Sequence, residues 1–164
     1  MKRTLSLILI LSFLWTPLAE AAVRGKAARY VGGTLAVLKE AVNGTWDMAE
    51  NEVVFTAEKS GARVSIPYAK IETLEYGQKV GRRMWGAAVG NVLILTPVTL
   101  LLLFSKKRKH FLTLTYLDEE GKKQGAVFEL AKKIVKDSVL ALEAKSGKKV
   151  EYESDEAKKH LEKQ

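Results

Sequence analysis

Alternation of apolar and polar residues predicts short strands in both halves of the chain. Residues 52–57 (EVVFTA) and 110–117 (HFLTLTYL) combine a period of two with the β-branched and aromatic side chains that favour strands. Residues 68–76 are expected to form a helical turn that leads into a strand, and Asn43-Gly44 is a hairpin turn signal. Weaker patterns predict further strands within residues 30–38, 45–48, 63–66 and 125–130.

One segment changes to the period of an amphipathic helix. From Leu130 to Ser146, buried-type residues recur at steps of three and four, and lysines occupy the other side. Gly147 follows as a suitable left-handed terminator. We therefore expect an α+β fold, in which a curved antiparallel sheet or partial barrel of about six or seven strands is closed by this C-terminal helix.

The longest apolar run lies in the middle of the chain, from Trp85 to Phe104 (WGAAVGNVLILTPVTLLLLF). It has no charged residue, and about 20 apolar residues are enough to cross the hydrocarbon core of a membrane as a helix. An apolar, membrane-type helical segment is therefore expected to interrupt the domain. Basic residues flank the run on both sides: Arg82, Arg83, Lys106, Lys107, Arg108 and Lys109.

Three placements of this run are compatible with the sequence. In a single span, residues 22–83 and 105–164 lie on opposite sides of the membrane, and the larger basic cluster after the run favours the cytoplasm for the second half. In a re-entrant or interfacial hairpin, Pro97 bends the chain and both halves stay on one side. In the third placement, the run is a helix buried in an oligomer.

The N-terminus predicts export. Two basic residues precede an apolar stretch, residues 5–18, which is followed by the small-residue site Ala19-Glu20-Ala21. Residues 1–21 are therefore interpreted as a signal peptide, and residues 22–29 as a flexible lead-in. A single domain is expected over residues 30–150, with the insert at 85–104. Residues 151–164 are expected to form a charged tail that is either a frayed helix or disordered.

The composition argues against metal binding and enzymatic activity. The chain has no cysteine and only two histidines, His110 and His160, which belong to no cluster with metal-ligand spacing. No nucleophile elbow or phosphate-binding motif is present, so we expect neither enzymatic activity nor a cofactor or metal. The net charge of +8 is concentrated beside the apolar run, which favours anionic lipid headgroups over nucleic acid as partners.

The order of elements resembles the pleckstrin-homology-like or GRAM-like fold, as found in small exported bacterial proteins without an assigned activity. The resemblance rests on four segments: residues 65–72 (SIPYAKIE), 110–116 (HFLTLTY), 126–130 (AVFEL) and 142–147 (LEAKSG). It implies strands that curl into a partial barrel closed by a C-terminal helix.

The leading hypothesis is a non-enzymatic, membrane-anchored protein of the bacterial envelope, whose small domain binds lipid headgroups or a protein partner. The predicted headgroup contacts are Arg82, Arg83, Trp85, Lys106, Lys107, Arg108 and Lys109. The alternative is a structural membrane protein without lipid specificity, which associates with itself through the small-residue face of Gly86 and Gly90. An accessory or sensor domain of an enzyme is the third hypothesis.

Overall fold

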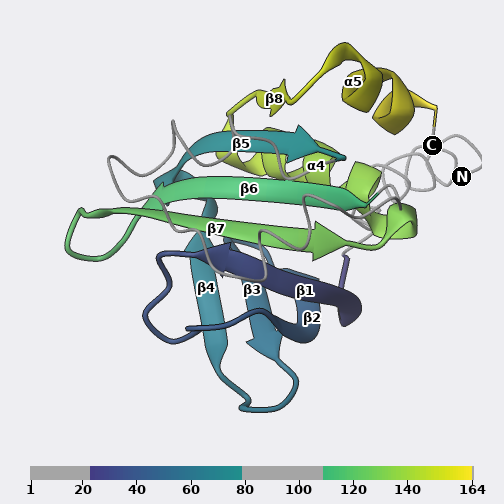
Figure 1. Cartoon of the computed structure of the whole chain (residues 1–164). Helices are drawn as coiled ribbons and strands as arrows, with labels where there is room; N and C mark the ends of the chain where they lie inside the picture. Colours follow the sequence, from purple (N-terminus) through teal and green to yellow (C-terminus); the bar gives the residue numbers. More distant parts are fainter. Residues whose placement is uncertain (1–22, 79–108, 164) are drawn as a thin grey trace, which may run out of the picture.

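A single open sheet organises the protein. The computed structural model describes residues 23–78 and 109–163 (Figure 1). The strands of the sheet follow the order β4-β3-β2-β1-β7-β6-β5-β8. Their bounds are β1 Lys26–Gly33, β2 Val42–Met48, β3 Glu52–Ala57, β4 Arg63–Pro67, β5 Ile71–Gly77, β6 His110–Leu117, β7 Lys123–Leu130 and β8 Val150–Tyr152. A 3-10 turn, Tyr68–Lys70, leads into β5, and the helices are α4 Lys132–Ser146 and α5 Asp155–Glu162.

Strand β1 joins the two halves of the sheet. It pairs antiparallel with β2 on one side and with β7, almost one hundred residues later in the chain, on the other. Tyr30 lies opposite Phe128 in this second pairing, and a bulge follows between Tyr30 and Gly32. Strands β3 and β4 run steeply across the direction of β5, β6 and β7, so the sheet is strongly twisted (Figure 1). Residues before position 79 and residues after position 108 therefore build one sheet.

Aromatic side chains fill the centre of the core. The ring centroid of Phe128 lies 5.0 Å from that of Trp46, 5.3 Å from that of Phe55 and 5.8 Å from that of Tyr30. All four side chains are at most 1% exposed. Tilted pairs of this kind add about 0.5–1.5 kcal/mol each beyond the burial of apolar area. This cluster connects β1, β2, β3 and β7.

The predicted C-terminal helix is confirmed as α4. It buries one stripe against the sheet, formed by Ile134, Val135, Ser138, Val139 and Leu142. Gly147 ends the helix with a φ of 69°, and its backbone N–H donates to the carbonyl oxygen of Glu143. Glycine is favoured there because a side chain makes this left-handed conformation strained.

The expected fold class is wrong, because the sheet is not closed into a partial barrel. The described residues form eight strands rather than six or seven, and their sheet is open and mixed instead of a partial barrel closed by a helix. Strand β8 pairs in parallel with β5 through Tyr76 and Tyr152. Strands β8 and β4 form the two edges of the sheet and do not pair with each other, so the described strands do not close into a barrel.

The expected membrane-type helix has no counterpart in the described ranges. Neither α4 nor α5 is long and apolar enough to cross a membrane. The predicted signal peptide at residues 1–21 and the apolar run at 85–104 lie outside the described residues.

Two local expectations also need correction. Asn43 and Gly44 are not a turn but part of β2, where Gly44 lies so close to Phe55 and Thr56 of β3 that an added Cβ would overlap both. Strand β1 begins at Lys26, within the residues assigned to the lead-in. In the charged C-terminal segment, the structure agrees with the helical alternative: after β8, α5 begins behind Ser154, whose side chain accepts from the backbone N–H of Ala157.

Candidate functional site

The most informative site is the end of the sheet where the chain leaves and re-enters the fold, here called the insertion end. Strand β5 ends at Gly77, and β6 begins at His110 as its antiparallel neighbour. The register pairs Gly77 with Phe111 and Tyr76 with Leu112. Residues 79–108 are therefore inserted between two adjacent paired strands, and both ends of the insertion start from the same end of the sheet.

Specific contacts hold the chain on both sides of this insertion. On the incoming side, the backbone N–H of Gln78 donates to Glu153 Oε2 at 3.0 Å. On the outgoing side, Lys109 Nζ lies 2.9 Å from Glu129 Oε2, with both side chains about three-quarters buried. A partly buried ion pair is less screened by salt than an exposed one. The two junctions are thus fixed to the domain by polar contacts.

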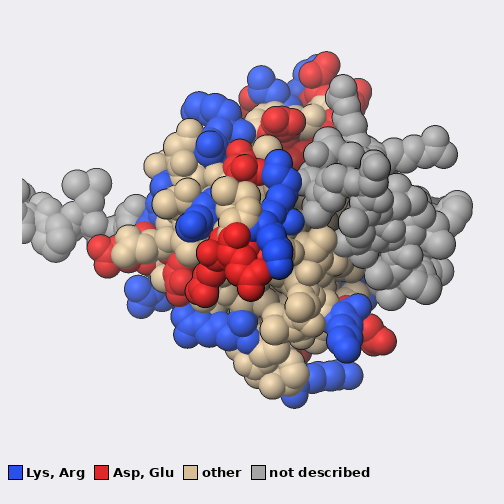
Figure 2. Space-filling view, turned by 90° about the vertical axis from the view of Figure 1, so that its left-hand side faces the viewer, with Lys and Arg blue, Asp and Glu red and all other residues tan. Residues whose placement is uncertain are grey.

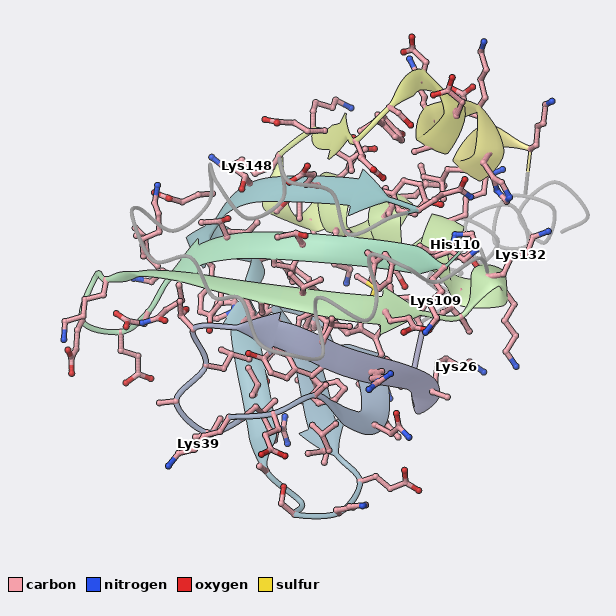
Figure 3. All side chains as sticks on the ribbon, viewed as in Figure 1. Lys26, Lys39, Lys109, His110, Lys132 and Lys148 are labelled. Atoms are coloured by element: carbon pink, nitrogen blue, oxygen red, sulfur yellow. The ribbon has the colours of Figure 1, made fainter. Side chains whose placement is uncertain are left out.

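Lysines gather at the insertion end. The register sets Leu130 opposite both His110 and Ala28, which brings the start of β1, the start of β6 and the residues after β7 together. Figure 3 shows Lys26, Lys109, His110 and Lys132 at this end, whereas Lys39 and Lys148 lie at the other side of the molecule. Lys26 and Lys132 are exposed, and neither forms an ion pair with another described residue.

The opposite end of the sheet has a different charge pattern. Figure 2 shows acidic side chains surrounded by basic ones on that side. They include the β6–β7 turn, where Lys122 pairs with Glu120, and the neighbouring pair of Lys123 with Glu72. Charges that are paired in this way attract an anionic surface less than the exposed lysines of the insertion end do.

A buried histidine connects the insertion end to the C-terminal helix. His110 Nδ1 lies 2.7 Å from Tyr76 Oη, and the two rings are stacked with centroids 6.1 Å apart. The His160 ring of α5 meets His110 edge-on at 5.6 Å. Burial lowers the pKa of His110, and the charges of His160 and Lys132 act in the same direction. Burial also raises the pKa of Tyr76 to about 12, so this pair is neutral at pH 7.

An open cleft of about 490 Å³ lies beside the Lys109–Glu129 pair. It is lined by Ala27, Ala28, Arg29, Asn43, Gly44, Glu58, Glu129, Leu130 and Ala131. Its charged groups are one guanidinium and two carboxylates, so the cleft has no excess of positive charge to select an anion. In the described ranges, no three His, Asp or Glu side chains come together to hold a metal ion.

Of the residues predicted from the sequence, the structure places only Lys109, and it pairs with Glu129 rather than lying free. The other predicted headgroup contacts, and Gly86 and Gly90, lie outside the described residues. The sequence reasoning missed Lys26 and Lys132 because they join the site only through strand pairing. No family model matches the chain, and no curated protein matches it in sequence.

Proposed function

We propose that this is a non-enzymatic, membrane-associated protein of the bacterial envelope. Its sheet domain lies on one side of the membrane, the insertion between β5 and β6 attaches it, and the lysines of the insertion end contact anionic headgroups. The observation that carries this proposal is the pairing of Gly77 with Phe111, because it sets both ends of the insertion side by side.

Strand pairing argues against the single-span placement. A chain that crossed the membrane once between β5 and β6 would separate two strands that are hydrogen-bonded neighbours. Two crossings need about 40 apolar residues, more than residues 79–108 supply. A segment that enters and leaves on the same side satisfies both constraints, so a re-entrant or interfacial insertion is favoured. Its irregular backbone then needs support from protein at membrane depth.

The exposed lysines support an orientation in which the insertion end of the domain faces the membrane. Each lysine close to an anionic surface contributes about 1 kcal/mol of binding free energy. Lys26 and Lys132 are exposed at the same end of the sheet as the insertion, so they approach the headgroups when the insertion is in the membrane. The basic flanks of the apolar run add to this attraction. The expected signal peptide, residues 1–21, agrees with an envelope location.

Membrane attachment is tested by carbonate extraction and flotation of the full-length protein from membranes. We expect wild-type protein to stay with the membrane, and Leu93→Asp/Leu101→Asp to release it, because charged groups are costly in hydrocarbon. The matched control is Val37→Asp/Leu140→Asp, which changes two residues that are 62% and 53% exposed in the domain. Wild-type protein that is soluble without carbonate would overturn the proposal.

A further inference from the structure

The sheet face turned away from α4 carries a buried patch, here called the second face. It consists of Val31, Phe111, Thr113, Thr115 and Val127, on strands β1, β6 and β7. The register places Thr113 opposite Val127, and the strand alternation puts Phe111 and Thr115 on the same side as Thr113. All five residues are at most 3% exposed, yet none belongs to the core beneath α4.

Nothing in the described ranges accounts for this burial. The buried side chains of α4 and α5, together with Leu35 and Leu38 of the β1–β2 connection, belong to the core on the other face. The hydroxyls of Thr113 and Thr115 are buried and have no hydrogen-bond partner among the described residues. A buried hydroxyl without a hydrogen-bond partner is destabilising, so the second face needs an occupant with both apolar and polar groups.

We propose that the apolar run, residues 85–104, packs against the second face. The segment that contains it, residues 79–108, starts beside Gly77 and returns at Lys109, so it is tethered at both ends to strands that border this patch. Strand β6, which directly follows the segment, itself supplies three of the five patch residues. Tethering at both ends favours this occupant over a free partner, because the effective concentration of a short tethered segment is high.

The composition of the apolar run suits a position between the second face of the sheet and the lipid. Asn91, Thr96 and Thr99 are the polar side chains among its apolar residues, and they and its backbone can pair with the buried threonine hydroxyls. Five patch side chains cannot cover all the large apolar side chains of the run. The uncovered part remains available to lipid, so packing on the sheet and attachment to the membrane are compatible. The sheet then provides the protein support that a re-entrant backbone requires.

Disulfide trapping tests this arrangement, since the chain has no cysteine of its own. Thr113→Cys is combined in turn with a cysteine at Val89, Leu93, Val98 or Leu101 in membrane-bound full-length protein. Disulfides form when the Cα atoms lie about 4.4–6.8 Å apart. We expect at least one pair to form an intrachain disulfide in most molecules after mild oxidation. Leu140→Cys, on the exposed side of α4, is the control and is expected to form none with the same partners.

Maleimide labelling of the single variants provides a second measurement. We expect Thr113→Cys to be protected in the folded protein and to react after denaturation, while Leu140→Cys reacts at once. The proposal is overturned if Thr113→Cys reacts as fast as Leu140→Cys, if no pair crosslinks, or if only disulfides between two chains appear, which would make a second copy the occupant. Carbonate extraction of the same variants distinguishes membrane attachment from packing on the second face. A variant that stays in the membrane but forms no intrachain disulfide supports attachment and contradicts the packing.

Discussion

Gly77 of β5 pairs with Phe111 of β6, although 33 residues of sequence lie between them. The pairing makes the long segment between them an insertion in one sheet instead of a linker between two half-domains. Without β6 and β7, the N-terminal half would lose the partner strand of β1, and the core would lose Phe128. The two halves therefore depend on each other, and a domain built from both cannot lie on two sides of a membrane.

Charge reversal at the insertion end is expected to weaken binding to anionic vesicles. In Lys26→Glu/Lys132→Glu, two attractions of about 1 kcal/mol each become repulsions, so we expect affinity to fall by at least about 30-fold. Lys39→Glu/Lys148→Glu carries the same change of net charge at the other side of the molecule (Figure 3). Vesicle flotation at low and high salt measures both variants. Equal loss in the two variants would show that net charge, and not the insertion end, governs binding.

Gly44→Ala is expected to destabilise the fold through overpacking. A Cβ at this position overlaps the Phe55 ring and the backbone carbonyl of Thr56, and backbone atoms cannot move away cheaply. We expect the free energy of unfolding to fall by about 1–3 kcal/mol. Asn43→Ala, at the exposed neighbouring position of β2, is the control and is expected to change it little. Urea denaturation measures the difference, and an unchanged midpoint for Gly44→Ala would contradict the close approach of β2 and β3.

Stability is expected to decrease as the pH falls below about 6.5. Burial lowers the pKa of His110 in the folded state, so the unfolded chain takes up a proton in a range where the folded protein does not. The loss begins near the ordinary histidine pKa and continues down to the lowered one. We expect the urea midpoint to be lower at pH 5 than at pH 7.5, and His110→Asn to reduce that difference.

The carboxyl group of Asp118 contributes to stability in a different pH range from His110. Hydrogen bonds from Gln124 and from the backbone of Lys122 and Glu120 lower its pKa below 3.8, so its contribution is lost only in more acidic solution. Between pH 7.5 and 5 the contribution of His110 therefore changes, whereas that of Asp118 does not. An identical pH dependence in wild-type protein and His110→Asn would refute the role of His110.

The sequence predicted local structure better than long-range structure. The strands at 52–57 and 110–117 and the helix ending at Gly147 were recognisable because their periodicity and terminators are local. The open sheet was not, because β8 has only three residues and forms through pairing with β5. Asn43-Gly44 has the composition of a turn, but tertiary packing against Phe55 determined its conformation.

For the candidate site too, the sequence predicted the local features but not the long-range contacts. The basic and apolar composition of residues 82–109 is visible in the sequence, and it predicts an association with the membrane. The convergence of Lys26, Lys132 and the His110–Tyr76 pair depends on strand register, to which no local pattern points.

The most direct test of the account is the sidedness of the two halves of the chain. Lys59→Cys and Lys148→Cys each place a single cysteine at an exposed position, one before and one after the insertion. Labelling with a membrane-impermeant maleimide is compared in intact and lysed spheroplasts. We predict that both cysteines are labelled from the same side of the membrane. Labelling from opposite sides would contradict the shared sheet and the inserted segment together.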